Sequence, residues 1–180
     1  PRAFLSSDFD TPDLRLARRG ITFRHRLEDG TGLWQLKLPS DVSRIELEVP
    51  GPPARQPGEL LDLLAAHLRG RELVRVARLR TRRQRRQVDG AEIVDDSVAV
   101  LDGQRVTSRF RELEIELLDG EEGALHRLEQ ALREAGAEPG STRPKLYRAL
   151  DLEYPLAPDE PPADAPLVVV PAMNRLMWAN

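Results

Sequence analysis

The segment from Phe110 to Leu118 alternates acidic and apolar residues, and it limits the fold more than any other part of the chain. Because successive side chains of a β-strand point to opposite faces, one face would carry three carboxylates: Glu112, Glu114 and Glu116. Carboxylates about 6–7 Å apart on one face repel each other unless positive charge lies opposite. The alternation therefore indicates either a solvated sheet face or a site for a hard divalent cation, which prefers carboxylate ligands.

Five other segments show the same alternation, and their charges are sorted by sign. Bases dominate the polar faces formed by Arg24 with Arg26, Gln35 with Lys37, and Arg78 with Arg80 and Arg82. Acids dominate the faces formed by Glu46 with Glu48 and Glu92 with Asp96. A solvated face usually mixes both signs, so the sorting favours basic and acidic strands that face one another inside a closed sheet. Such a lumen suits metal-bound polyphosphate, because Arg clamps phosphoryl oxygens and Glu holds the cation.

Turn residues divide the chain into strands and amphipathic helices. The expected strands are Ala3–Phe9, Gly20–Glu28, Gly32–Leu38, Ser43–Val49, Leu73–Gln87, Ala91–Leu101 and Val106–Leu118. Short connections such as Asp29-Gly30 and Asp89-Gly90 are typical of hairpins, so consecutive strands should be antiparallel. Leucine spacing predicts helices over Gly58–Leu68 and Glu121–Ala135, and a short third helix is expected at Pro144–Leu150. The fold class is therefore α+β and mainly β.

A single domain over residues 1–153 accounts for these elements. A Pro-rich linker over residues 154–166 and a short apolar tail over residues 167–180 follow. Two interpretations of the tail stay open: it packs on this domain, or it is the start of a following domain. The chain begins with Pro almost directly in a strand, so we expect further residues upstream.

Composition argues against several classes of function. The absence of Cys excludes thiol nucleophiles and Cys-based zinc sites. A net charge of −3 argues against a nucleic-acid partner, and the basic run Arg82–Arg86 lacks neighbouring aromatic residues on which bases would stack. No apolar run approaches the ~20 residues of a membrane span, so we expect a cytoplasmic protein that does not enter a membrane. The three dispersed histidines and Trp34 are interpreted as packing or surface residues.

Seven motifs occur in a characteristic order between Ser7 and Leu150. They are Phe-Asp-Thr-Pro-Asp at 9–13, Arg-His-Arg at 24–26, Trp-Gln-Leu-Lys at 34–37, Arg-Ile-Glu-Leu-Glu at 44–48, Ala-Arg-Leu-Arg-Thr-Arg-Arg at 77–83, the Phe110–Leu117 run, and Lys-Leu-Tyr-Arg-Ala-Leu at 145–150. In this order they resemble the CYTH family, the triphosphate tunnel enzymes that include bacterial class IV adenylate cyclases and thiamine triphosphatases. The amino-acid sequence of these motifs resembles that of the actinobacterial branch of the family, in which a helical CHAD domain often follows the CYTH domain.

The resemblance implies an antiparallel eight-stranded barrel that forms a tunnel under two to three covering helices. It also implies roles for the charged residues. The phosphate ligands would be Arg24, Arg26, Lys37, Arg78, Arg80, Arg82 and, near the tunnel mouth, Lys145. The ligands of Mg²⁺ or Mn²⁺ would be Glu112, Glu114, Glu116 and Asp96. Catalytic positioning of water would fall to Glu46 and Glu48.

Family members begin with a Glu-x-Glu-x-Lys strand, which this chain lacks, so the barrel is expected without its first strand. The function that the resemblance implies is metal-dependent hydrolysis of a triphosphate, with inorganic triphosphate as the favoured substrate. The alternative is a non-catalytic module that binds polyphosphate or a nucleotide. Expected partners are therefore the anion itself and a CHAD-type helical domain.

Overall fold

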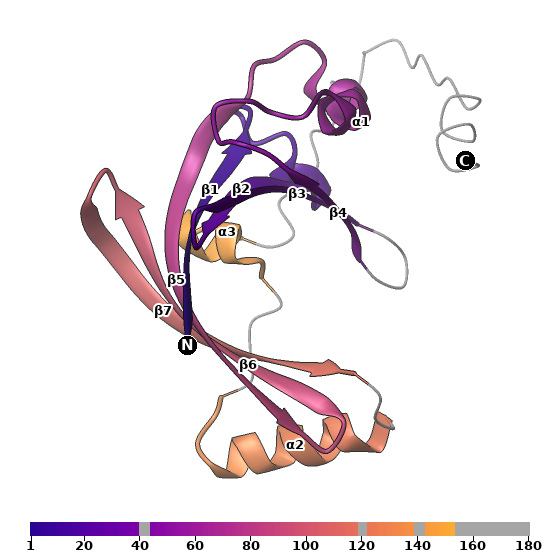
Figure 1. The fold of residues 1–180 in the computed structure, drawn as a ribbon, viewed down its shortest axis with the longest axis vertical. Coiled ribbons are helices and arrows are strands. Elements are labelled where there is room, and N and C mark those ends of the chain that lie inside the picture. Colours follow the sequence, from indigo (N-terminus) through magenta and orange to yellow (C-terminus); the bar gives the residue numbers. More distant parts are fainter. Residues whose placement is uncertain (40–43, 119–121, 139–142, 154–180) are drawn as a thin grey trace.

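Seven antiparallel strands form one curved sheet in the computed structural model, which describes residues 1–39, 44–118, 122–138 and 143–153 (Figure 1). The elements in chain order are β1 (Arg2–Asp10), the 3-10 turn η1 (Ala17–Arg19), β2 (Thr22–Glu28), β3 (Thr31–Pro39), β4 (Arg44–Pro50), α1 (Gly58–Leu68), β5 (Val74–Val88), β6 (Ala91–Asp102), β7 (Arg105–Leu117), α2 (Glu122–Glu134) and α3 (Lys145–Ala149). The strands and helices expected from the sequence are confirmed, with ends that differ by a few residues at most.

The strands lie in the order β4-β3-β2-β1-β5-β6-β7, and each neighbouring pair is antiparallel. Two meanders, β1 to β4 and β5 to β7, are therefore joined through the pairing of β1 with β5. The long strands β5, β6 and β7 bend away from the first meander, so the sheet as a whole is strongly curved (Figure 1). A mainly β, antiparallel tunnel fold with seven of the eight strands matches the sequence prediction.

The convex face of β2 and β3 packs under α1. Phe23, Trp34 and Leu36 are buried there against Leu60 and Leu64 of the helix. Burial of such side chains contributes about 1.5–3 kcal/mol each and fixes the first meander. The indole N–H of Trp34 donates to the carbonyl oxygen of Pro52 at 3.0 Å, which confirms that Trp34 is a packing residue.

Gly32 is required where β3 passes beneath the chain that follows β4. A Cβ atom at this position would lie 2.4 Å from the carbonyl oxygen of Gly51 and 2.7 Å from Nε2 of His25. His25 itself is buried, and its Nε2 lies 3.0 Å from the same carbonyl oxygen. The prediction that His25 packs on the apolar face is confirmed.

The helix α3 lies on the concave side of the sheet, next to β1 and β5 (Figure 1). Leu146 and Tyr147 of α3 are buried with Ala17 and Ala77. The Tyr147 hydroxyl also donates a hydrogen bond to the carbonyl oxygen of Ala17. Along β5 the concave face is therefore apolar beside α3, and its charged part begins farther along this strand, at Arg83.

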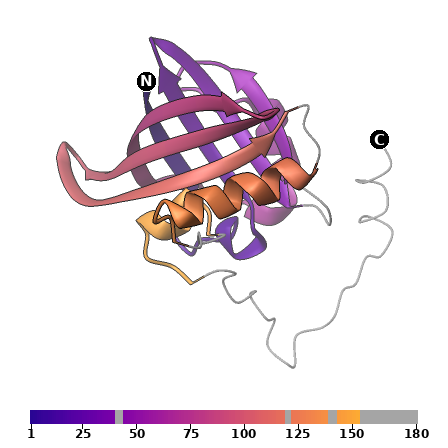
Figure 2. The same cartoon turned by 90° about the horizontal axis from the view of Figure 1, so that it is seen from below.

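The helix α2 runs alongside β7 at the other end of the sheet (Figure 2). Of the three leucines whose spacing predicted this helix, Leu128 is buried together with Ala124, whereas Leu125 and Leu132 are half-buried and line the cavity side. Within the described part of the chain, none of the helices has the length and hydropathy that a membrane span needs. The expected linker over 154–166 and the tail over 167–180 lie outside the described residues.

Candidate functional site

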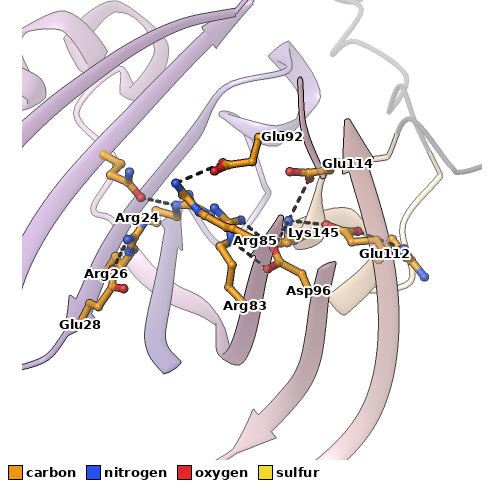
Figure 3. A network of polar contacts seen from close by, with 12 residues as sticks. Arg24, Arg26, Glu28, Arg83, Arg85, Glu92, Asp96, Glu112, Glu114 and Lys145 are labelled. Carbon is orange, nitrogen blue, oxygen red and sulfur yellow. Dashed lines mark hydrogen bonds and ion pairs between the residues drawn. The ribbon is translucent and has the colours of Figure 1, made fainter. Parts of the chain in front are cut away.

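A cavity of about 1480 Å³ occupies the concave side of the sheet. Its lining combines basic and acidic side chains from β2, β3, β4, β5 and β7 with residues of α2 and α3. This is the charged lumen that the sorted alternation predicted. Figure 3 shows part of its lining from close by, with side chains that come from opposite sides of the hollow.

The basic wall is built by β2 and β3. Strand alternation places Arg24 and Arg26 in the cavity, and cross-strand pairing sets Arg24 beside Gln35 and Thr22 beside Lys37. Arg24 Nε donates to Gln35 Oε1 at 2.8 Å, so this guanidinium is held in place. Burial lowers the pKa of Arg24, while the neighbouring Asp8 carboxylate opposes that change. Arg24, Arg26 and Lys37 thus lie together, as the sequence predicted.

The edge strand β4 adds its two glutamates to this wall. Glu46 lies opposite Lys37 and accepts a hydrogen bond from its ammonium group. Glu48 lies opposite Gln35 and accepts a hydrogen bond from its amide nitrogen. Both carboxylates line the cavity, where they could accept a proton from a water molecule beside a bound anion. Their catalytic role stays a prediction.

The sequence predicted that Arg78, Arg80 and Arg82 of β5 line the lumen, and this placement is wrong. Strand alternation puts Arg78, Arg80 and Arg82 on the convex face, and none of the three lines the main cavity. Arg80 and Arg82 line a separate shallow hollow there, beside Arg109 of β7. Arg78 Nη1 lies 3.4 Å from the carbonyl oxygen of Gly103, at the β6–β7 turn.

The residues of β5 that enter the cavity are Arg83 and Arg85. The physical reason is that α3 packs inside the curve of the sheet. It makes the concave face apolar at Ala77 and Leu79, and the same face becomes charged from Arg83 onward. The same face of β5 is therefore apolar at Ala77 and charged at Arg83. Because the sequence pattern was read at the apolar end of the strand, it assigned the arginines of the opposite face to the lumen.

An ion-pair network fills the far wall of the cavity (Figure 3). Arg83 binds Asp96 through two hydrogen bonds, Nε to Oδ1 at 2.8 Å and Nη2 to Oδ2 at 2.7 Å. Lys145 of α3 reaches the same carboxylate, with Nζ 3.1 Å from Asp96 Oδ2. It also lies 3.1 Å from Glu114 Oε1 and contacts Glu112. Arg148, one turn along α3, donates to Glu112 Oε2 at 3.1 Å.

These pairings shift the protonation equilibria of the buried members. Burial disfavours the ionised form of Asp96, yet its pKa falls because Arg83 and Lys145 stabilise the carboxylate. Burial likewise disfavours the ammonium of Lys145, but Glu114, Glu112 and Asp96 raise its pKa. Asp96 and Lys145 are therefore both charged near neutral pH.

The four predicted metal ligands supply suitable oxygen donors, but their arrangement is not that of a metal site. Among the described residues, no group of three or more His, Asp or Glu side chains has the geometry of a metal site in the present arrangement. Asp96, Glu112 and Glu114 converge on the ammonium of Lys145. Glu116 lines the cavity beside Glu92 of β6, which pairs with Arg85 at 3.3 Å. Lys145, predicted as a phosphate ligand, here contacts carboxylates.

Asp8 is a lumen residue that the sequence reasoning did not assign to the site. It is buried on β1, lines the cavity, and lies opposite Arg24 in the β1–β2 pairing. Within the described residues its Oδ2 atom has no hydrogen-bond partner. Burial raises its pKa to about 6, although Arg24 opposes the change. Alternation along β1, with Ser6, Asp8 and Asp10 on one face, was the signal that could have found it.

A family model described as the CYTH domain matches residues 9–147. Two curated relatives, uncharacterised proteins from two strains of Mycobacterium tuberculosis, are 34% identical over 184 residues. The match includes 87% of this chain, which spans 36% of the length of each relative.

Solved structures share the fold at lower identity. A putative adenylate cyclase from Bacillus halodurans aligns with a TM-score of 0.67 and 19% identity, over 82% of this chain and 81% of that one. A Hippeastrum protein, described as a putative adenylyl cyclase with a dominant triphosphatase activity, aligns with a TM-score of 0.54 and 19% identity, over 83% and 82% of the two chains. PH1819 from Pyrococcus horikoshii aligns with a TM-score of 0.52 and 22% identity, over 84% and 86%. The family match over most of the described sheet, together with this shared fold, shows that the chain belongs to the CYTH domain family.

Proposed function

We propose that the cavity binds a linear triphosphate and hydrolyses its terminal phosphoryl group in a reaction that depends on Mg²⁺ or Mn²⁺. The observation that carries this proposal is the grouping of Arg24, Arg26 and Lys37 on one wall of a cavity whose other wall holds Arg83 and Lys145. Guanidinium groups bind phosphoryl oxygens through two parallel hydrogen bonds, so these walls can hold an elongated, highly charged anion between them. The Hippeastrum relative of the same fold, described as having triphosphatase activity, supports the proposed class of substrate.

The proposed reaction is attack of water on the terminal phosphorus. A bond from the water oxygen to phosphorus forms, the bond from phosphorus to the bridging oxygen breaks, and orthophosphate and diphosphate leave. Glu46 and Glu48 would orient the water and accept its proton, which is then released to solvent. Arg24 and Arg26 would stabilise the charge that develops on the phosphoryl oxygens. A divalent cation, when bound, would neutralise and orient those oxygens.

The second candidate is a module that binds polyphosphate without turnover. It is favoured by one observation: Lys145, Arg83 and Arg148 already neutralise the carboxylates expected to hold the metal. Inorganic triphosphate is the favoured ligand in both cases, because no described feature of the cavity resembles a pocket for a nucleobase. A CHAD-type helical domain as partner and a cytoplasmic location are parts of the same proposal.

Phosphate release from tripolyphosphate separates the two candidates. With Mg²⁺ present, we expect steady release of orthophosphate in a malachite-green assay, and loss of that release when EDTA replaces the metal. The double substitution Glu46→Gln and Glu48→Gln should lower the rate at least tenfold while tripolyphosphate still binds. Binding without release in the wild type, with either Mg²⁺ or Mn²⁺, would establish the binding module instead.

A further inference from the structure

Asp96, Glu112 and Glu114 form one wall of the cavity, called the acidic wall below. Lys145 occupies the place on this wall that the sequence assigned to a metal ion. Its Nζ atom lies 3.1 Å from Asp96 Oδ2 on β6 and 3.1 Å from Glu114 Oε1 on β7, and it also contacts Glu112 (Figure 3). These three carboxylates belong to the predicted set of metal ligands. An ammonium group and a divalent cation therefore compete for the same oxygen atoms.

The charges of this wall already cancel. Three acids, Asp96, Glu112 and Glu114, are in contact with three bases, Lys145, Arg83 and Arg148. A divalent ion that added itself to this neutral group would gain little electrostatic attraction, and it would have to displace Lys145 to reach the oxygens. The Lys145 side chain is 13% exposed and that of Asp96 is 1% exposed, so solvent screens their attraction only weakly.

The backbone that carries Lys145 is anchored, whereas its side chain is long. Leu146 and Tyr147 are buried in the apolar cluster that fixes α3 to the sheet, and the backbone N–H of Leu152 bonds to the Tyr147 carbonyl at 2.9 Å. A lysine side chain has four flexible carbons, so its ammonium can move several ångströms without movement of the helix. Lys145 also lines the cavity in which the anion is proposed to bind.

We propose that Lys145 is the resident counter-cation of the acidic wall, and that it makes divalent-metal binding depend on the anion. In the free protein the ammonium satisfies the carboxylates and keeps the affinity for free metal low. A bound polyphosphate supplies Lys145 with phosphoryl oxygens as new partners, and Asp96, Glu112 and Glu114 become available to the cation. Because such coupling is reciprocal, metal also strengthens anion binding by the same factor. The inference rests on the proposed function only in taking the anion to be a polyphosphate.

Removal of the lysine charge tests the competition directly. Binding of Mn²⁺ alone to the whole chain can be followed by loss of the free-ion signal in electron paramagnetic resonance. We expect Lys145→Met to bind Mn²⁺ at least tenfold more tightly than the wild type, in the absence of any anion. Lys145→Arg keeps the charge and should bind Mn²⁺ as weakly as the wild type. Arg109→Met removes one positive charge from β7 on the convex face, so it serves as the matched control and should also resemble the wild type.

Equal Mn²⁺ affinity in Lys145→Met and the wild type would overturn the inference, as would an equal gain in Arg109→Met. A folded Lys145→Arg variant with tight Mn²⁺ binding would also overturn it. A second measurement uses the wild type alone and so does not depend on the Met variant. Tripolyphosphate is titrated into the protein with and without Mg²⁺, and the data are corrected for Mg²⁺ that the anion binds in solution. We expect the anion to bind at least fivefold more tightly when Mg²⁺ is present. Phosphate release is a separate measurement, so a wild type without turnover can still show this coupling, and an active enzyme can lack it.

Discussion

The guanidinium of Arg83 and the carboxylate of Asp96 form a two-point ion pair across β5 and β6, with distances of 2.8 and 2.7 Å. The side chain of Asp96 is almost fully buried, so this pair fixes which face of β5 turns toward the cavity. Arg82, the preceding residue, must then point to the convex face. Two adjacent arginines of one strand thus belong to different surfaces of the protein.

Substitution of these two neighbours tests the register. Arg83→Gln should weaken tripolyphosphate binding about tenfold or more, because a charged hydrogen-bond partner of the anion contributes about 1.5–3 kcal/mol. Arg82→Gln removes the same charge from the other face and should change the dissociation constant less than twofold. Isothermal titration calorimetry measures both. A larger effect of Arg82→Gln would show that the register described for β5 does not hold in solution.

Local sequence patterns predicted the elements well but not how distant elements meet. The helix over Gly58–Leu68 and the hairpin turns follow from residue spacing and turn chemistry, which act over a few positions. The pairing of β1 with β5 joins residues 64 to 81 positions apart, from Asp10 with Val74 to Arg2 with Arg83, and no local pattern reports it. The contact of Lys145 with Asp96 depends on that pairing and on the docking of α3, so the sequence named both residues without placing them together.

Asp8 gives a pH-dependent prediction for stability. Its pKa is about 6 in the folded protein, above the value of about 4 expected in the unfolded chain. Between these values the folded state binds more protons, so stability falls as pH rises from 4 to 6. Asp8→Asn removes the buried negative charge, so it should raise the free energy of unfolding at pH 7.5 by about 3 kcal/mol. The gain should vanish below pH 4.

Urea unfolding of wild type and Asp8→Asn at pH 7.5 and at pH 4 checks this dependence. The same substitution removes a negative charge from the cavity, so tripolyphosphate should bind more tightly at pH 7.5. A variant that is less stable than the wild type at pH 7.5 would show that ionised Asp8 has a partner that stabilises it.

Gly32 offers a test of the close packing between β3 and the chain that follows β4. An alanine there would place its Cβ atom 2.4 Å from the Gly51 carbonyl oxygen, a contact that requires backbone movement. Gly32→Ala should therefore lower the free energy of unfolding by about 1–3 kcal/mol. Gly58→Ala is the matched control, because a Cβ at the start of α1 meets no atom within 4 Å. Urea unfolding measures both, and an unperturbed Gly32→Ala would contradict the described course of the chain from β4 toward α1.

The central claim is that the concave cavity, and not the convex arginine face, binds the polyphosphate anion. The most direct measurement is calorimetric titration of tripolyphosphate without metal into three proteins: the wild type, Arg24→Gln with Arg26→Gln, and Arg80→Gln with Arg82→Gln. The two double variants lose the same charge from opposite faces of the sheet. We predict that the cavity variant loses at least 30-fold in affinity and that the convex-face variant stays within twofold of the wild type. Equal losses in both variants, or a larger loss on the convex face, would contradict the claim.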